Sequence, residues 1–352
     1  MTTHERFERM YRHVEADRVP VMDYAWPETI QRWRREGLPT DDYVSYFDLD
    51  KTASIATDNS PRLPVYTVEE TEDYIIRTTP WGVANKNFKS HTTTPEDVSH
   101  VVNSYEAWKK VRERMTPADD RIPWDMLRRE YKTWRSEGRW ITGELWFGFD
   151  ITHSHMVGTE TVLMAMFDEP EWIIDMIDRE LTLSLQLLER VWDAGYTFDE
   201  IHWPDDMGYK GTQFFSLSMY REIVKPFHQR AIDWGHAHGC KVRLHSCGNI
   251  MPFVPELVEM GLDGLNPLEV KAGMDPLYLK KTYGDKLLFH GGINAANWGK
   301  RAVITKEIET YVPMLKEKGG YIFASDHSIP DYVSFEDFKN IIETVKRVGS
   351  YE

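Results

Sequence analysis

The sequence predicts an α/β protein built as a (β/α)8 TIM barrel. From residue 139 onward, short apolar runs alternate with longer stretches of helical periodicity, and that order is typical of a parallel sheet covered by helices. Polar side chains recur where the expected strands end, which is where barrel enzymes place their active sites. An open doubly wound sheet is the second choice. No glycine-rich nucleotide-binding motif follows an expected strand, so nucleotide binding is not expected.

The N-terminal part predicts a helix, a strand and a second helix. Apolar residues recur at helical spacing within residues 5–15. The run Arg-Val-Pro-Val-Met-Asp at 18–23 predicts the first strand of the barrel. A helix is then expected to begin near Trp26 and to end at Gly37.

Between residues 55 and 90 the pattern changes to two short strands joined by an acidic turn, at 64–79. This pattern is typical of an antiparallel hairpin inserted into the fold. The chain has no repeat, low-complexity stretch or linker-like run. Residues 1–352 are therefore expected to form a single barrel domain that carries this N-terminal helical and β-hairpin insertion.

The second half of the chain supplies the regular alternation of strands and helices. Strands are expected at 140–146, 198–203, 242–247, 264–268, 287–291 and 321–325. Helices are expected at 161–166, 171–191, 218–238, 251–260, 276–283, 304–317 and 335–348. Together with the strand at 18–23 and one strand that the pattern does not locate, the strand count approaches eight.

Composition narrows the function classes. The 42 basic and 57 acidic residues give a net charge of −15, which disfavours nucleic acid as a partner. No stretch is apolar enough to cross a membrane, and the first residues lack the apolar core of a signal peptide. Cys240 and Cys247 have opposite parity and about 20 Å of strand between them, so no disulfide is expected. We therefore expect a reduced, cytoplasmic location.

The most informative segment, 241–249, predicts a strand that ends in a turn at Gly248. Because side chains alternate along a strand, Arg243, His245 and Cys247 are expected on one face. An imidazole and a thiol at the C-terminal end of a strand supply two ligands of a catalytic zinc site. A buried structural cysteine beside a hydrogen-bonded histidine is the alternative.

Other polar residues follow the same strand ends. They are Glu144, Asp205, Asp206, Asn266, Glu269, His290, Asp326 and His327. Aromatic residues in or beside the expected loops are candidates to line a pocket for a flat or methylated ligand. They are Trp26, Trp81, Trp146 and Trp203.

These segments resemble the uroporphyrinogen decarboxylase superfamily. The motifs that carry the resemblance lie at 245–249, 256–269, 291–294 and 320–330, with further similarity at 17–21 and 205–208. The resemblance covers most of the chain. That superfamily contains porphyrinogen decarboxylases and also zinc-dependent methyltransferases that exchange methyl groups with corrinoid proteins.

One departure separates these two branches. Uroporphyrinogen decarboxylases carry an Arg-Gln-Ala-Gly-Arg stretch after the first strand, whose arginines hold propionate groups. The matching region here, 22–32, has acidic and aromatic residues instead. Because a site for eight carboxylates needs such arginines, the methyltransferase branch is favoured.

The methyltransferase branch binds zinc through His-x-Cys and a later Cys, which implies His245 and Cys247 as ligands. The later Cys is absent, and His327 stands at the matching place, so His327 is expected as the third ligand. The resemblance implies a zinc-dependent methyltransferase that takes a methyl group from a small methylated compound, such as a methoxylated aromatic ether. The acceptor would be the cobalamin of a corrinoid protein, which is a transient partner.

The methyltransferase interpretation also assigns roles in proton transfer and substrate binding. Glu144 and Asp206 are expected to be the catalytic residues that handle the proton. The residues expected to bind substrate are Trp26, Trp146, Trp203, Asp205, Asn266 and Asp326.

Three alternatives stay open at this point. One is a metal-free decarboxylase or lyase that uses Asp206 and His327 as acid and base. Another is a methylcobamide:thiol methyltransferase that uses the same zinc. The third is a non-catalytic protein that binds a tetrapyrrole or corrinoid.

Overall fold

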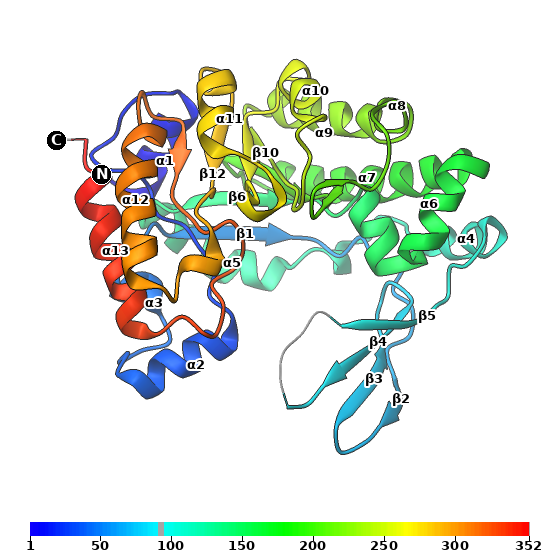
Figure 1. Cartoon of the computed structure of the whole chain (residues 1–352). Helices are drawn as coiled ribbons and strands as arrows, with labels where there is room; N and C mark the ends of the chain where they lie inside the picture. Colours follow the sequence, from blue (N-terminus) through cyan, green and yellow to red (C-terminus); the bar gives the residue numbers. More distant parts are fainter. Residues whose placement is uncertain (91–94, 352) are drawn as a thin grey trace.

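A curled parallel sheet forms the centre of the computed structural model, which describes residues 1–90 and 95–351, and helices cover its outer face (Figure 1). The seven strands are adjacent in the order in which they follow one another along the chain, and every neighbouring pair is parallel. They are β1 (Thr52–Ala56), β6 (Trp140–Glu144), β7 (Glu200–Pro204), β10 (Lys241–His245), β11 (Gly264–Asn266), β12 (Leu288–His290) and β13 (Tyr321–Ile322). The predicted α/β class and parallel sheet are confirmed, and β1 is the strand that the pattern did not locate.

The helices between and after these strands largely follow the prediction. They are α6 (Thr159–Asp168), α7 (Pro170–Asp193), α9 (Lys225–Ala237), α10 (Val254–Glu259), α11 (Pro276–Tyr283), α12 (Arg301–Leu315) and α13 (Phe335–Val348). The single helix expected at 218–238 is instead divided into α8 (Leu217–Met219), a π-helical turn (Tyr220–Val224) and α9. Pro226 lies at the start of α9 and has no N–H to donate, so the hydrogen-bond ladder cannot continue unbroken there.

The expected first strand at 18–23 is an extended segment rather than a member of a regular ladder. Val21 makes an isolated parallel bridge to Phe323, just after β13. On its other side, the backbone N–H of Asp50 donates to the carbonyl of Val21 (3.1 Å), while the N–H of Val21 donates to the Asp50 carboxylate (2.8 Å). Pro20 has no N–H to donate, and the N–H of Val21 binds a side chain rather than a neighbouring strand. The segment therefore makes isolated bridges, Arg18 to Ser350 and Val21 to Phe323, and no continuous ladder.

The N-terminal part also contains a second sheet, larger than the predicted hairpin. Its four antiparallel strands are β2 (Thr67–Glu70), β3 (Tyr74–Thr78), β4 (Val83–Phe88) and β5 (Glu96–His100). The two predicted strands correspond to β2 and β3. The remaining elements are α1 (Thr3–Tyr11), α2 (Pro27–Glu36), α3 (Tyr43–Tyr46), α4 (Tyr105–Val111), α5 (Trp124–Ser136) and the short pair β8 (Gly208–Tyr209) and β9 (Thr212–Gln213). None of the helices within the described ranges is long and apolar enough to cross a membrane.

The two faces of the central strands have different surroundings. In β7, Ile201 and Trp203 are fully buried against the helical layer, and Val242 and Leu244 of β10 are buried in the same way. Helix α9 lies so close that a Cβ at Gly235 would meet a methyl group of Val242 at 2.7 Å. The opposite face therefore carries the polar residues of these strands into the interior of the curled sheet.

A closed polar layer fills the interior near the N-terminal ends of the strands. The buried Glu200 carboxylate accepts hydrogen bonds from Arg243 (2.7 and 2.9 Å), from the Tyr11 hydroxyl (2.5 Å) and from the Trp140 indole (3.1 Å). Both carboxylate oxygens are thus satisfied, and the Arg243 charge is neutralised. This layer, which we call the Glu200 layer, forms the floor beneath the site described next.

Candidate metal site and ligand cavity

A cavity of about 280 Å³ opens above the Glu200 layer, at the C-terminal ends of the parallel strands. Consecutive strands contribute its polar wall because their register aligns them: Glu144 lies opposite His202, and His245 lies opposite Asn266. The residues of the wall that matter below are Ser54, Glu144, His202, His245, Asn266 and His290. This is the end of a parallel sheet at which barrel enzymes bind their ligands.

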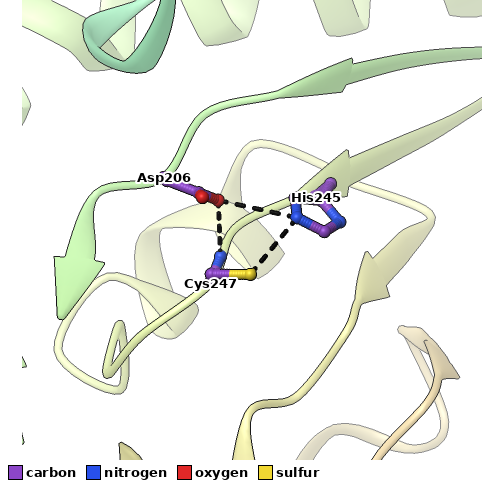
Figure 2. A group of neighbouring side chains, drawn as sticks. All are labelled: Asp206, His245 and Cys247. Carbon is purple, nitrogen blue, oxygen red and sulfur yellow. Dashed lines mark hydrogen bonds and ion pairs between the residues drawn. The ribbon is translucent and has the colours of Figure 1, made fainter. Parts of the chain in front are cut away.

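Figure 2 shows Asp206, His245 and Cys247 close together. All three line the cavity, and we call this part of its wall the rim. His245 comes from the end of β10, Cys247 from the turn that follows, and Asp206 from the loop after β7. The Nε2 atom of His245 is 3.4 Å from the Cys247 Sγ and 3.6 Å from the Asp206 Oδ1. Among the described residues, this is the group whose ligand atoms all lie within 4.8 Å of one another.

These separations fit a tetrahedral metal ion. Zinc binds sulfur at about 2.3 Å and nitrogen or oxygen at about 2.0–2.2 Å, so two of its ligand atoms are about 3.3–3.7 Å apart. One thiolate, one imidazole and one carboxylate also form a donor set that suits zinc and leaves a fourth position for a ligand. Burial and the neighbouring Asp206 raise the pKa of the Cys247 thiol, and a bound cation would reverse that effect.

Neighbouring groups hold the three side chains in place. The Asn266 Oδ1 lies 2.6 Å from the Nδ1 of His245, which fixes the proton on Nδ1 and leaves Nε2 free to bind a metal. The backbone N–H of Cys247 donates to Asp206 Oδ1 at 2.7 Å. Gly248 has a φ of 77°, and a Cβ there would lie 2.1 Å from the carbonyl carbon of Gly208. The turn after Cys247 therefore requires glycine.

A second group of polar side chains lies deeper in the cavity. The Nδ1 of His202 is 2.7 Å from the Glu144 Oε2, and the Ser54 hydroxyl donates to Oε1 at 2.9 Å. Burial raises the pKa of Glu144, but the hydrogen bonds from His202 and Ser54, together with the positive charge of Arg243, outweigh burial and lower it. Burial, aided by Arg243, lowers the pKa of His202, and it lowers the pKa of His290 to about 3. Both imidazoles are therefore neutral near pH 7.

His327 occupies a different place from the one expected of a third metal ligand. It lines the cavity, and its ring lies edge-on to the Trp26 ring at 6.3 Å between centroids. It is not in the cluster with His245 and Cys247, where Asp206 stands instead. Asp206, which was expected as a catalytic residue, lies within this cluster and lines the cavity.

None of the four expected tryptophans is among the described residues that line the cavity, and Trp26 only contacts the wall residue His327. Trp203 is fully buried on the outer face of β7, against Phe147 and His228. Trp146 lies beyond the end of β6 and lines a separate small pocket with Trp81. The expected substrate contacts of Trp203 and Trp146 therefore do not follow from this geometry.

Two of the expected carboxylates hold loops rather than facing the cavity. Asp205 is fully buried, pairs with His228 at 2.8 Å and accepts the backbone N–H of Asp150. Asp326 is also buried and accepts the backbone N–H groups of Val270 and Ala295. Each carboxylate satisfies backbone donors of the neighbouring loops, which is a structural role.

His202 was not among the predicted site residues. Strand alternation contains the signal that would have found it, because Glu200 and His202 share one face of β7 while Ile201 and Trp203 share the other. Asn266, which was expected to bind substrate, lines the cavity and also contacts His245. Glu144, expected as a catalytic residue, does line the cavity.

Comparisons with known proteins agree with this architecture. The model of the uroporphyrinogen decarboxylase (URO-D) family matches residues 151–348. A methyltransferase from Methanosarcina mazei has a similar structure, with a TM-score of 0.62 and 14% sequence identity, covering 99% of each chain. A broad-specificity endoglucanase from Clostridium longisporum aligns with a TM-score of 0.36 and 12% identity over 86% of this chain and 98% of its own, too weakly to indicate a common fold. No curated protein matches the sequence.

Proposed function

Because the chain belongs to the uroporphyrinogen decarboxylase family, we propose that it is a metal-dependent methyltransferase of that family. The observation that carries the proposal is the cluster of Asp206, His245 and Cys247, whose ligand atoms have the spacing of a zinc site. The fold shared with the Methanosarcina mazei methyltransferase supports it as well.

In this proposal His245 and Cys247 bind zinc, and Asp206 is the third protein ligand in place of His327. The 3.6 Å separation between Asp206 and His245 supports that assignment. Zinc content after single substitutions tests it: Asp206→Ala should lose the metal, whereas His327→Ala should keep it. The opposite result would restore His327 as the ligand.

A zinc ion in this position would act as a Lewis acid on the heteroatom that loses the methyl group. The chain's own residues prepare the site around it. Asn266 orients His245, while Ser54 and Glu144 orient His202 on the opposite part of the wall. The Glu200 layer lies at the end of the cavity opposite the cluster and leaves no unpaired carboxylate oxygen there.

We propose that the methyl donor is a small methylated compound, such as a methoxylated aromatic ether, and that the acceptor is the cobalamin of a separate corrinoid protein. The cavity volume of about 280 Å³ is just below the usual range for ligand pockets, about 300–1,000 Å³, which favours a small ligand. Arg243 is the one arginine among the described residues of the wall, and Glu200 neutralises it. A substrate with several carboxylates would therefore lack cationic partners.

We also propose that the curled sheet is closed into a complete barrel. The extended segment at Val21 lies beside β13 on one side and contacts Asp50, which precedes β1, on the other. We infer that this segment takes the eighth position and completes the (β/α)8 arrangement.

Methyl transfer can be tested directly with the full chain. Zinc-loaded protein incubated with cob(I)alamin and 2-methoxyphenol should form methylcobalamin, which is visible in the absorption spectrum. Protein stripped of metal by a chelator should be inactive and should recover activity with zinc. Full activity without metal, or decarboxylation of uroporphyrinogen in place of methyl transfer, would contradict the proposal.

A further inference from the structure

Two histidines in the inner part of the cavity each have one nitrogen engaged and one unpaired. His202 projects from β7 and His290 from β12, and both side chains line the cavity. The Nε2 of His202 and the Nδ1 of His290 are buried and have no hydrogen-bond partner among the residues that the structure describes. What each unpaired nitrogen can do depends on where the imidazole proton lies.

The proton of His202 is fixed by its neighbours. Its Nδ1 faces the Glu144 Oε2 at 2.7 Å, and the other oxygen of that carboxylate already accepts from the Ser54 hydroxyl. An ionised carboxylate only accepts hydrogen bonds, so Nδ1 must carry the proton. The Nε2 atom of His202 is then an acceptor with a free lone pair.

The proton of His290 is fixed in the opposite sense. Its Nε2 lies 2.9 Å from the carbonyl oxygen of Met22, and a carbonyl can only accept, so Nε2 carries the proton. The remaining Nδ1 is therefore also an acceptor. The low pKa of His290 keeps this imidazole neutral.

We propose that His202 and His290 form a hydrogen-bond-acceptor subsite that selects methylated ligands carrying a free hydroxyl group. A buried acceptor without a donor costs free energy, and a hydroxyl supplies the donor without bringing a charge into the closed part of the cavity. The inference deepens the proposed function and rests on it for the methyl group of the ligand. A phenol with an adjacent methoxy group represents this class of ligand.

Equilibrium binding to the zinc-loaded full chain tests the subsite without any methyl transfer. The probes are 2-methoxyphenol, which has one hydroxyl donor, and 1,2-dimethoxybenzene, which has none. Wild-type protein should bind 2-methoxyphenol about tenfold more tightly. Equal affinities, or no binding of either compound, would overturn the inference.

The Glu144→Gln variant separates this role from a structural one. With Ser54 donating to the amide oxygen, the amide N–H₂ faces His202, so the imidazole proton moves to Nε2 and the acceptor becomes a donor. The preference for 2-methoxyphenol should then disappear, and 1,2-dimethoxybenzene should bind at least as well. His202→Phe removes the acceptor by a second route and should also abolish the preference, while Glu106→Gln, an exposed pair with Lys109, should retain it.

The two proposals can fail separately. If the hydroxyl preference follows these substitutions but no methylcobalamin forms, the subsite stands and the methyltransferase proposal is wrong. If methyl transfer occurs while Glu144→Gln and His202→Phe keep the wild-type preference, the methyltransferase proposal stands and the subsite is wrong.

Discussion

The strands β7 and β10 carry two polar layers of opposite character on the same face. Near their N-terminal ends, Glu200 and Arg243 form a buried ion pair in which both carboxylate oxygens have donors. Two residues further along each strand, His202 has an unpaired nitrogen, and His245 faces the ligand atoms of two other residues. The same backbone therefore presents a satisfied layer and an unsatisfied one.

The difference between the layers separates stability from function. Removing one member of a buried, fully hydrogen-bonded ion pair destabilises the fold, because the other charge is then left buried without a partner. Buried polar groups without hydrogen-bond partners lower the stability of the fold until a ligand or a metal ion provides the missing partner. Substitutions in the Glu200 layer should therefore affect unfolding, and substitutions at the rim should affect binding.

The largest effect is expected from Glu200→Gln. This change leaves the buried Arg243 charge without its carboxylate, so the free energy of unfolding should fall by about 3–5 kcal/mol. Urea denaturation followed by circular dichroism measures it. The exposed Glu106→Gln should change the free energy by less than about 0.5 kcal/mol, and a loss that small for Glu200→Gln would show that this layer does not stabilise the fold.

At the rim, Cys247→Ala should give the reverse pattern. Zinc affinity should fall by more than about 100-fold because a direct ligand is lost, while the unfolding free energy of the metal-free protein changes by about 1 kcal/mol or less. Cys240→Ala is the matched control, since its buried thiol donates to the Phe198 carbonyl away from the cluster. Zinc content by mass spectrometry distinguishes them, and equal zinc loss in both variants would contradict this placement.

Asn266→Ala sharpens the comparison by acting through His245. Without the Asn266 Oδ1, the Nδ1–H of His245 has no acceptor, so neither the orientation of the ring nor the position of its proton is fixed. Zinc affinity should therefore fall by about 10–100-fold. A competition titration with a chromophoric chelator measures the affinity. Asn266→Asp keeps an acceptor oxygen and should recover most of it; no difference between these two variants would speak against the orienting role.

A further effect is expected on acid stability at His290, where the comparison extends to a buried titratable group of the cavity wall. Its folded pKa of about 3 lies below the unfolded value of about 6.5, so the unfolded chain takes up the proton first. The contribution of neutral His290 to the free energy of unfolding is fully present above about pH 6.5. It decreases toward pH 3, by up to about 1.4 kcal/mol per pH unit. Unfolding free energies of wild type and His290→Gln between pH 7 and pH 4 should diverge as the pH falls, and parallel profiles would rule out this contribution.

Strand alternation predicted part of the site from the sequence. The period of two placed Arg243, His245 and Cys247 on one face, and all three line the cavity. The same rule applied to β7 would have included His202 and excluded Trp203, whose aromatic character suggested a pocket. A strand-end location alone was therefore a weaker guide than the face of the strand.

Other features depend on contacts that local sequence does not contain. Asp205 and Asp326 follow strands, as catalytic carboxylates do. Their oxygens, however, accept hydrogen bonds from backbone N–H groups that are distant in the sequence. Asp206 joins the cluster because its loop passes over the turn after β10, which alignment of motifs cannot show. The family and the parallel sheet were predictable because they depend on motifs and periodicity along the chain.

Zinc K-edge X-ray absorption on the full chain loaded with one equivalent of zinc tests the central claim most directly. The cluster of Asp206, His245 and Cys247 predicts one sulfur at about 2.3 Å together with nitrogen and oxygen at about 2.0–2.2 Å. The sulfur shell should vanish in Cys247→Ala and persist in Cys240→Ala. A wild-type spectrum without sulfur would contradict the metal site and, with it, the proposed methyltransferase.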